Sequence, residues 1–296
     1  MPVGFTLPSF AKINLLLRIL GKRDDGFHEL LTVFQTVSLC DVLSFQVDSR
    51  LKLTCNLKYL PTDERNLIVR AAKAMQERFG TAKGAAIHLE KRIPSPGGLG
   101  GGSSNAATTL IALKRLWQID CGVSELYSIA SELGSDAAFF LHGGTAMGTG
   151  RGELIDPTND CDEPFLVIVT PNVRVSTREA FRRMGVGALT NEALDHNLQV
   201  CRKEAESLDL RHSALINDFE ASVFSAYPEV KRVKDTLLGL GAVNAAMSGS
   251  GASVFAVFDK EETRQAALKA LDRESTWRKF AVATVSRSEY REALGI

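Results

Sequence analysis

The sequence contains little that would point to a metal centre, a disulfide framework or a highly charged partner. Its five cysteines are scattered without a C-x-x-C pair, and its five histidines show no H-x-x-x-H spacing. The 35 basic residues balance the 35 acidic ones, so no global field would hold nucleic acid or an anionic membrane. No segment approaches the ~18 uninterrupted apolar residues of a membrane span, and no secretory leader pattern opens the chain. These absences predict a cytoplasmic protein with reduced thiols and a small-molecule ligand.

Strand and helix patterns mix without a regular βα alternation. The expected strands are one over 11–20, buried on both faces, and others over 33–37, 42–47, 51–57, 85–89, 165–170, 253–258 and 279–285, the last of which would close the chain. The expected helices are those over 66–79, 124–133, 178–184, 191–206, 213–225, 230–240 and 260–272, with a further helix after the glycine-rich segment described next. This order favours an α+β fold over a doubly wound sheet. A turn-rich stretch near residue 156 divides the chain into two expected domains, 1–155 and 156–296.

The strongest local signal is a glycine-rich segment between residues 93 and 107. Five glycines fall within residues 97–102. Glycine permits positive φ and lets backbone N–H groups approach a ligand closely. The apolar helix that follows, capped by Ser103 or Ser104, would point its positive end at this loop. Neither the G-x-x-x-x-G-K-[ST] pattern nor G-x-G-x-x-G is present, yet a phosphate cradle is favoured over a flexible connector because the loop runs directly into a helix.

Polar residues interrupt several apolar runs. Lys12 and Asn14 share one face of an otherwise apolar strand, and a buried ammonium needs a partner. Lys12 could reach solvent at a sheet edge or meet Asp136 in a cleft, and Asp136 could serve as a helix cap, as a functional carboxylate or as both. Phe27 and His28 follow a charged turn. Such a pair could form a surface turn, or could stack on a planar ring and hydrogen-bond its edge.

Together these motifs resemble the GHMP small-molecule kinases. They occur in the family's order and span most of the chain: Ala11–Leu15, Gly26–Leu30, Pro94–Ala107, Gly134–Phe140 and Ser248–Ser253. The long glycine loop and the Gly-Phe-His segment are typical of the members that act on a cytidyl substrate. The resemblance implies a two-domain GHMP fold with the active site in the interdomain cleft, and an N-terminal ATP-binding domain of a type also found in ribosomal proteins.

The resemblance also implies a reaction. The γ-phosphoryl group of ATP, with Mg²⁺, would pass to the 2-hydroxyl of 4-diphosphocytidyl-2-C-methyl-D-erythritol in the non-mevalonate (methylerythritol phosphate) route to isoprenoid precursors. Asp136 would take the hydroxyl proton as general base, and Lys12 would keep Asp136 ionised and stabilise the developing alkoxide. The open alternatives are another GHMP kinase of the homoserine or mevalonate type, and a non-catalytic nucleotide-binding module.

Carried over residue by residue, the resemblance implies two binding sets. The expected ATP-binding residues are Asn66, Leu67, Lys91, Pro94, Gly97, Gly98, Leu99, Gly100, Gly101, Gly102, Ser103 and Ser104, with Ser104 the first candidate for a metal ligand. The expected substrate-binding residues are Asn14, Phe27, His28, Asp136, Thr177 and Phe181. Within this second set, His28 would read the cytosine edge and Phe181 would stack on the ring.

Overall fold

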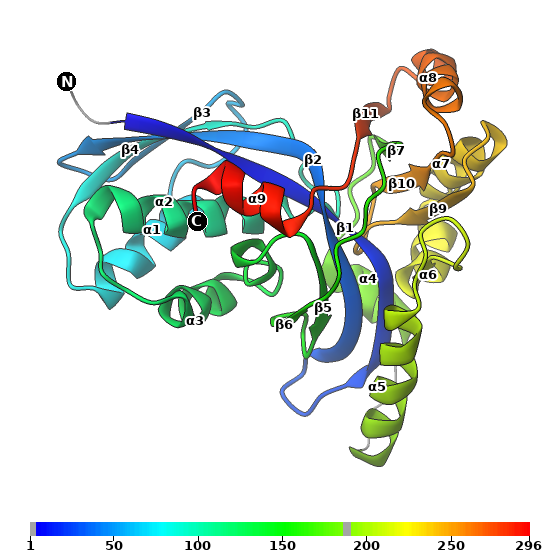
Figure 1. The fold of residues 1–296 in the computed structure, drawn as a ribbon, viewed down its shortest axis with the longest axis horizontal. Helices are drawn as coiled ribbons and strands as arrows, with labels where there is room; N and C mark the ends of the chain where they lie inside the picture. The colour runs from blue at the N-terminus through cyan, green and yellow to red at the C-terminus, as the bar shows by residue number, and fades with distance from the viewer. Residues whose placement is uncertain (1–3, 186–190) are drawn as a thin grey trace.

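Two very long strands join the two bodies of the molecule (Figure 1). The computed structural model describes residues 4–185 and 191–296. Strand β1 (Gly4–Lys22) pairs antiparallel with β2 (His28–Asp48), and register shifts interrupt the ladder at three points, one of them between residues 14 and 16. Residues 11–17 of β1 are all buried, which confirms the expected strand with two buried faces. Such irregularities re-aim side chains and are common beside active sites.

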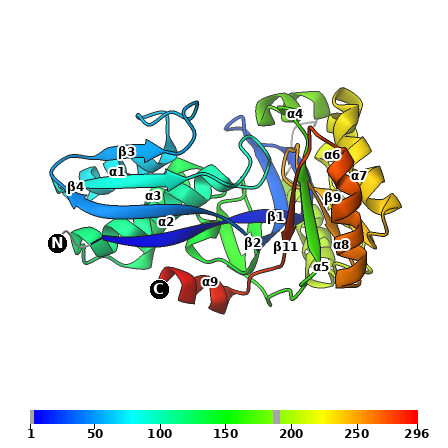
Figure 2. The same ribbon diagram turned by 90° about the horizontal axis from the view of Figure 1, so that it is seen from above.

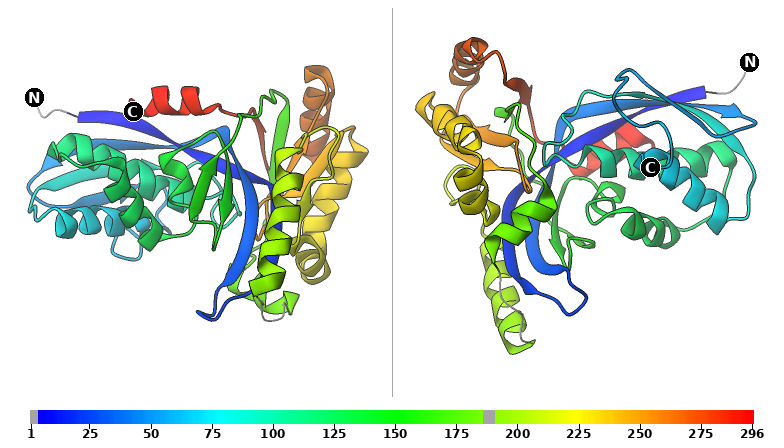
Figure 3. Two further views of the ribbon diagram at one scale, coloured as in Figure 1. Left: turned by 60° about the horizontal axis from the view of Figure 1, so that its bottom comes forward. Right: turned by 180° about the vertical axis from the view of Figure 1, so that it is seen from behind.

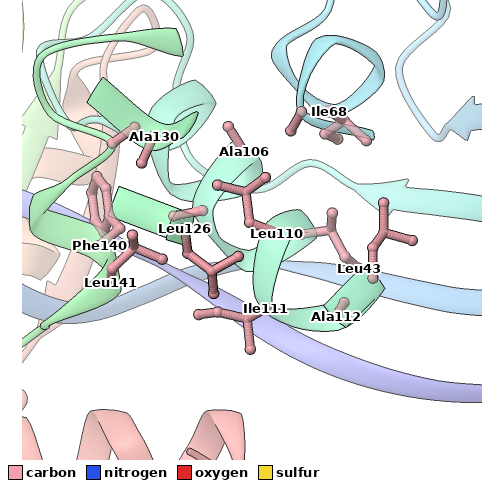
Figure 4. Packing of buried hydrophobic residues seen from close by; sticks show 14 of the residues in the cluster. Leu43, Ile68, Ala106, Leu110, Ile111, Ala112, Leu126, Ala130, Phe140 and Leu141 are labelled. Carbon is pink, nitrogen blue, oxygen red and sulfur yellow. The ribbon is translucent and has the colours of Figure 1, made fainter. Parts of the chain in front are cut away.

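The first body is a sheet covered on one face by helices. Its strand order is β3-β4-β2-β1-β8, with β5 pairing to β2 and β6 to β5. The strands added here are β3 (Lys52–Cys55), β4 (Gly84–Glu90), β5 (Thr145–Thr149), β6 (Leu154–Pro157) and β8 (Ile216–Asn217). The covering helices are α1 (Leu67–Arg78), α2 (Gly101–Trp117) and α3 (Val123–Leu133), followed by the short η1 (Phe139–Leu141). Apolar side chains of α2 and α3 meet those of the sheet in this core (Figure 4).

The second body is an antiparallel sheet in the order β11-β7-β10-β9. Its strands are β7 (Leu166–Thr170), β9 (Asn244–Met247), β10 (Val254–Val257) and β11 (Arg278–Val282). Its helices are α4 (Thr177–Met184), α5 (Asn191–Glu206), α6 (Phe219–Ala226), α7 (Pro228–Gly239) and α8 (Glu261–Ala270), with η2 (Leu271–Arg273). In Figure 2 the second sheet stands between the first body and helices α6–α8, and Figure 3 shows α5 beside β1 and β2.

Alternation along the strands of the second sheet explains this layering. Leu166 and Ile168 of β7 pack in a cluster with apolar residues from the middle of β1 and the first half of β2. Val167 and Val169 pack on the helical side. Because successive side chains of a strand point to opposite faces, one sheet closes two cores at once. None of the described helices has the length and apolar character needed to cross a membrane.

The structure also departs from the expected elements. The helix expected over 213–225 begins only at Phe219, because residues 216–217 form β8 against β1. After β11 the chain continues into a helix that was not expected, α9 (Arg287–Leu294). Tyr290 of α9 is fully buried in the core of the first body, where its hydroxyl donates to the carbonyl of Phe140 at 2.5 Å. The division into domains 1–155 and 156–296 stays a prediction, and α9 packs outside its own half.

Candidate active site

The glycine-rich loop forms a tight turn in front of helix α2. Gly98 and Gly100 have φ of +75° and +68°. A Cβ on Gly98 would lie 2.1 Å from the carbonyl oxygen of Ser248, and one on Gly100 would lie 2.8 Å from the ring of Phe140. Side chains are therefore excluded at both positions by conformation and by space. Backbone contacts hold the loop to both bodies: Lys12 N–H donates to the carbonyl of Leu99 at 3.0 Å, and Ser253 N–H donates to the carbonyl of Gly97 at 3.1 Å.

Helix α2 begins one turn earlier than expected. Its N-cap is Gly100, which makes no side-chain capping bond, so the prediction of Ser103 or Ser104 as the cap was wrong. The left-handed conformation at Gly100 turns the chain into the helix before either serine is reached. By helix geometry the first N–H groups have no acceptor within the helix. The N–H groups of residues 101–103 and the positive end of the helix dipole therefore suit an anion.

Lys12 and Asp136 meet at the floor of a cavity of about 210 Å³. The ammonium lies 3.2 Å from Asp136 Oδ2, with the lysine side chain 4% exposed and the aspartate 32% exposed. It also donates to Asn14 Oδ1 at 2.6 Å, and Asn14 in turn donates to Thr32 Oγ1 at 2.7 Å. Lys12 is thus fixed on two sides, and Asp136 lines the cavity with its side chain partly exposed.

The glycine turn before β10 closes the site from the second body. Ser248 donates its hydroxyl to the carbonyl of Gly98 at 2.9 Å and lies 3.4 Å from Asn14 Oδ1. Thr177, the first residue of α4, shares a hydrogen bond with Ser250 at 2.8 Å. Strand β1, the glycine loop and the turn at 247–251 therefore form one hydrogen-bonded unit across the two bodies.

A second cavity of about 660 Å³ adjoins the first. Both are lined by the same five residues: Leu30, Ser135, Arg151, Thr177 and Phe181. The ring of Phe181 stacks on His28 with centroids 4.5 Å apart and planes at 15°. Phe27 is 52% exposed, with the guanidinium of Arg151 over its ring at 4.9 Å. Burial lowers the pKa of His28, with a further contribution from Lys22, which favours the neutral imidazole with one donor and one acceptor.

Comparisons with known proteins agree with this geometry. The family model "GHMP kinases N terminal domain" matches residues 66–144, and "GHMP kinases C terminal" matches residues 199–275. A 4-diphosphocytidyl-2-C-methyl-D-erythritol kinase of Chlorobium phaeobacteroides is 43% identical, over 88% of this chain and 91% of its own. The kinase of the same name from Syntrophus aciditrophicus is 38% identical, over 93% and 97%. This chain belongs to the 4-diphosphocytidyl-2-C-methyl-D-erythritol kinase family of GHMP kinases.

Solved structures support the same family. A crystal structure of 4-(cytidine 5'-diphospho)-2C-methyl-D-erythritol kinase superposes with a TM-score of 0.76 at 31% identity, covering 95% of this chain and 99% of that one. A homoserine kinase from Cytophaga hutchinsonii shares the fold with a TM-score of 0.70 at 21% identity, covering 96% of each chain. The expected α+β GHMP fold and the expected family are confirmed, and membership makes this chain an ATP-using kinase.

Some of the expected nucleotide-binding residues of this kinase lie beside the glycine loop, and others are buried in the protein interior. Asn66 caps α1, accepting from Ile68 N–H at 3.0 Å, and Leu67 begins that helix beside the glycine loop. Ser104 points into the core, where Ser9 donates to its hydroxyl at 2.8 Å. Its side chain therefore does not face the loop as a metal ligand would. Lys91 is likewise buried, with its ammonium paired internally rather than lining a cavity.

Four cations of the larger cavity were not anticipated from the sequence of this kinase. They are Lys22, Arg151, Arg178 and Arg182, and the lining itself contains no acidic side chain of the described residues. Arg151 and Arg182 each pair with a glutamate outside that lining. None of the four belongs to a motif, and they are contributed by three separate segments of the chain. A surplus of basic residues in one place is invisible in a sequence whose charges balance overall. The fold brings them together.

Proposed function

We propose that this chain transfers the γ-phosphoryl group of ATP to the 2-hydroxyl of 4-diphosphocytidyl-2-C-methyl-D-erythritol, with ADP as the second product, in the non-mevalonate route to isoprenoid precursors. The observation that carries the proposal is the junction of two cavities. One holds Lys12 and Asp136, and the other holds aromatic rings and four cations. A substrate with an alcohol at one end and a nucleobase at the other, joined by a diphosphate, matches that sequence of surroundings. The use of ATP and the scattered cysteines suit the cytoplasm.

At the alcohol end, we assign the proton transfer to Asp136. Its free carboxylate oxygen accepts the hydroxyl proton, and the ammonium of Lys12, 3.2 Å from the carboxylate, stabilises the alkoxide as it forms. Phosphoryl transfer otherwise depends on positioning and on neutralising phosphate charge. Here the N–H groups of residues 101–103 and the dipole of α2 supply that neutralisation.

The glycine loop suits a nucleoside triphosphate, because the positive φ of Gly98 and Gly100 and their close packing against protein atoms form a tight turn. In such a turn backbone N–H groups can approach phosphate oxygens closely. Mg²⁺ would add charge neutralisation at the transferred group. Within residues 4–185 and 191–296 no three His, Cys, Asp or Glu side chains gather as metal ligands. In our proposal the phosphate oxygens of ATP, together with water, therefore supply most of the Mg²⁺ ligands, as is usual in kinases.

At the cytidyl end, we assign ring binding to Phe27 and Phe181 and edge recognition to His28. A neutral imidazole supplies one donor and one acceptor to the cytosine edge, and each aromatic ring offers a stacking face. The guanidinium of Arg151 lines both cavities, between the ring-binding end and Asp136. We therefore assign it, with Lys22, to the diphosphate of the substrate.

Acceptor preference tests the proposal directly. Release of ADP, measured by a coupled assay at saturating MgATP, is expected with the cytidyl substrate and not with homoserine or mevalonate. A small alcohol would occupy the 210 Å³ cavity and leave the 660 Å³ cavity unused. Turnover of homoserine or mevalonate alone would instead assign another GHMP activity. Binding of MgATP with no turnover of any of the three would support a non-catalytic module.

A substitution refines this test. Phe27→Leu keeps an apolar side chain but removes the ring, and we expect a higher KM for the cytidyl substrate with an unchanged KM for ATP. Val123→Ala, at another exposed apolar position, provides the control. Equal changes in both KM values for Phe27→Leu would overturn the assignment of this end of the site.

A further inference from the structure

A buried ion pair lies beneath the glycine loop, outside both cavities. Lys91 follows the last residue of β4, and Asp41 lies within β2. Their side chains are 4% and 0% exposed, and Lys91 Nζ lies 2.8 Å from Asp41 Oδ2. Burial lowers the pKa of Lys91, and the negative charge of Asp41 opposes that shift. A buried pair of this kind costs desolvation energy, so its position calls for an explanation beyond general stability.

The hydrogen bonds of this pair converge on the residues that lead into the loop. Lys91 Nζ donates to the carbonyl of Ile93 at 2.6 Å. Asp41 Oδ1 accepts from the N–H groups of Arg92 and Ile93 at 2.7 Å and 2.8 Å. Pro94 follows directly, and the glycines begin at Gly97. The pair therefore holds the backbone immediately before the loop through three directional bonds, all made to residues 92–93.

The same ammonium also touches the other end of the loop. A Cβ on Gly101, the first residue of α2, would lie 3.0 Å from Lys91 Nζ and 3.0 Å from a methyl of Ile93. The first turn of the helix thus rests on the lysine head group and on the residue that this head group binds. The Lys91 side chain therefore fixes the start of the loop relative to the start of helix α2, and no free space separates the two.

We propose that Lys91 and Asp41 are a positioning pair that aligns the N–H groups of residues 101–103 with the phosphates of ATP. The inference rests on the proposed function only in taking ATP as the ligand of this loop. Neither side chain touches the nucleotide in this arrangement. Both act through the backbone, so their loss changes the affinity for MgATP and leaves the cytidyl end of the site as it was.

The variant that tests the pair is Lys91→Met combined with Asp41→Asn. Lys91→Met alone would leave the Asp41 carboxylate buried without a counter-charge, which is strongly destabilising. In the double variant the amide oxygen of residue 41 still accepts from the N–H groups of Arg92 and Ile93, and no charge is left unpaired. What is lost is the bond from the ammonium to the carbonyl of Ile93 and the support of the ammonium under Gly101.

Lys83→Met is the matched control. Its ammonium donates to the carbonyl of Trp117, the last residue of the same helix, so this substitution also removes a lysine that braces α2. The bracing there is at the end away from the glycine loop. A merely structural role for lysines against α2 predicts the same small effect on nucleotide binding in both variants.

Affinity for MgATP is measured by calorimetric titration of the full-length protein, with KM values for ATP and for the cytidyl substrate alongside. For the double variant we expect the Kd for MgATP to rise about tenfold, or about 1.4 kcal/mol, with KM for the cytidyl substrate nearly unchanged. For Lys83→Met we expect a Kd for MgATP equal to that of the unaltered protein. A double variant that binds MgATP normally, or an equal loss in Lys83→Met, would overturn the positioning role.

Lys91→Arg decides the matter where the double variant does not fold. It keeps the charge for Asp41, but the larger guanidinium has no room under Gly101, so weaker MgATP binding is expected, with a Tm lowered by the crowding. Normal MgATP binding by Lys91→Arg would contradict the proposal. The titration needs no phosphoryl acceptor, so failure of the proposed reaction and failure of the positioning role give different results.

Discussion

Replacing Asp136 with asparagine removes the assigned proton acceptor and changes little else. The side chain is 32% exposed, and among the residues that the structure describes its one ion pair is with Lys12. Lys12 is only 4% exposed, so the loss of its counter-charge costs more than the roughly 1 kcal/mol of a fully exposed pair. Lys12 retains its bond to Asn14 Oδ1 at 2.6 Å, so no buried ammonium is left without a partner. Asp136→Asn should therefore still fold, with a Tm lowered by the loss of the counter-charge.

The catalytic effect should be much larger than the effect on stability. A positioned general base contributes about 10²–10⁴-fold in rate, which corresponds to about 2.7–5.4 kcal/mol of barrier. We expect kcat to fall by that factor, since an amide cannot take up the hydroxyl proton. The Kd for MgATP should stay within about twofold, because the assigned phosphate donors are the N–H groups of α2, on a different segment of the chain.

The assay is coupled ADP release with the cytidyl substrate, paired with calorimetric titration of MgATP. Asp156→Asn, at an exposed aspartate of β6, is the control for a generic change of charge and should be fully active. A loss in kcat of less than about tenfold in Asp136→Asn would fall below the range of a general base and refute the assignment. So would an equal loss in the control.

Three further outcomes are expected. Gly98→Ala should abolish MgATP binding in a titration, because its methyl would lie 2.1 Å from the carbonyl oxygen of Ser248. Gly239→Ala, with nothing within 4 Å, should bind normally, and equal behaviour of the two would contradict the packing argument. Phe181→Ala should raise KM for the cytidyl substrate but not for ATP, and a matched rise in both would reject the stacking role. Because burial lowers the pKa of His28, its imidazole should stay neutral at pH values where an exposed histidine is already protonated. KM for the cytidyl substrate should then rise only as the pH falls below about 6.5, and a rise that begins above pH 7 would contradict this.

The parts of the site that sequence reasoning could reach are those encoded in short segments. The glycine run needs positive φ and close backbone packing, and both requirements are visible in composition alone. Lys12 was conspicuous because a charge in an apolar strand needs a partner, and the structure supplies Asp136 at 3.2 Å. The fold class followed from the irregular order of strands and helices. These signals lie in short segments of the chain, so they can be recognised without knowing the fold.

What sequence reasoning missed depends on contacts between distant segments. Residues 216–217 were expected to be helical, and the free edge of β1 pairs with them instead. Lys91 follows a strand within reach of the glycine loop, but its burial is set by Asp41, fifty residues earlier. The start of α2 is set by the left-handed turn at Gly100, which wedges between Phe140 and Lys12. Each of these outcomes needs the tertiary packing and has no local signature.

The position of Tyr290 has a consequence for how the protein is made. Its hydroxyl binds the carbonyl of Phe140, 150 residues earlier in the chain, and its ring occupies the space that a side chain at Gly143 would take. The segment from Phe140 to Gly143 follows closely on Asp136 in the chain. During translation, the core of the first body therefore keeps an unfilled cavity beside the active site until α9 has been synthesised. Competence for catalysis therefore requires the synthesis of α9, and a nascent chain stopped before residue 290 holds every assigned catalytic group without the packing of Tyr290 against Phe140.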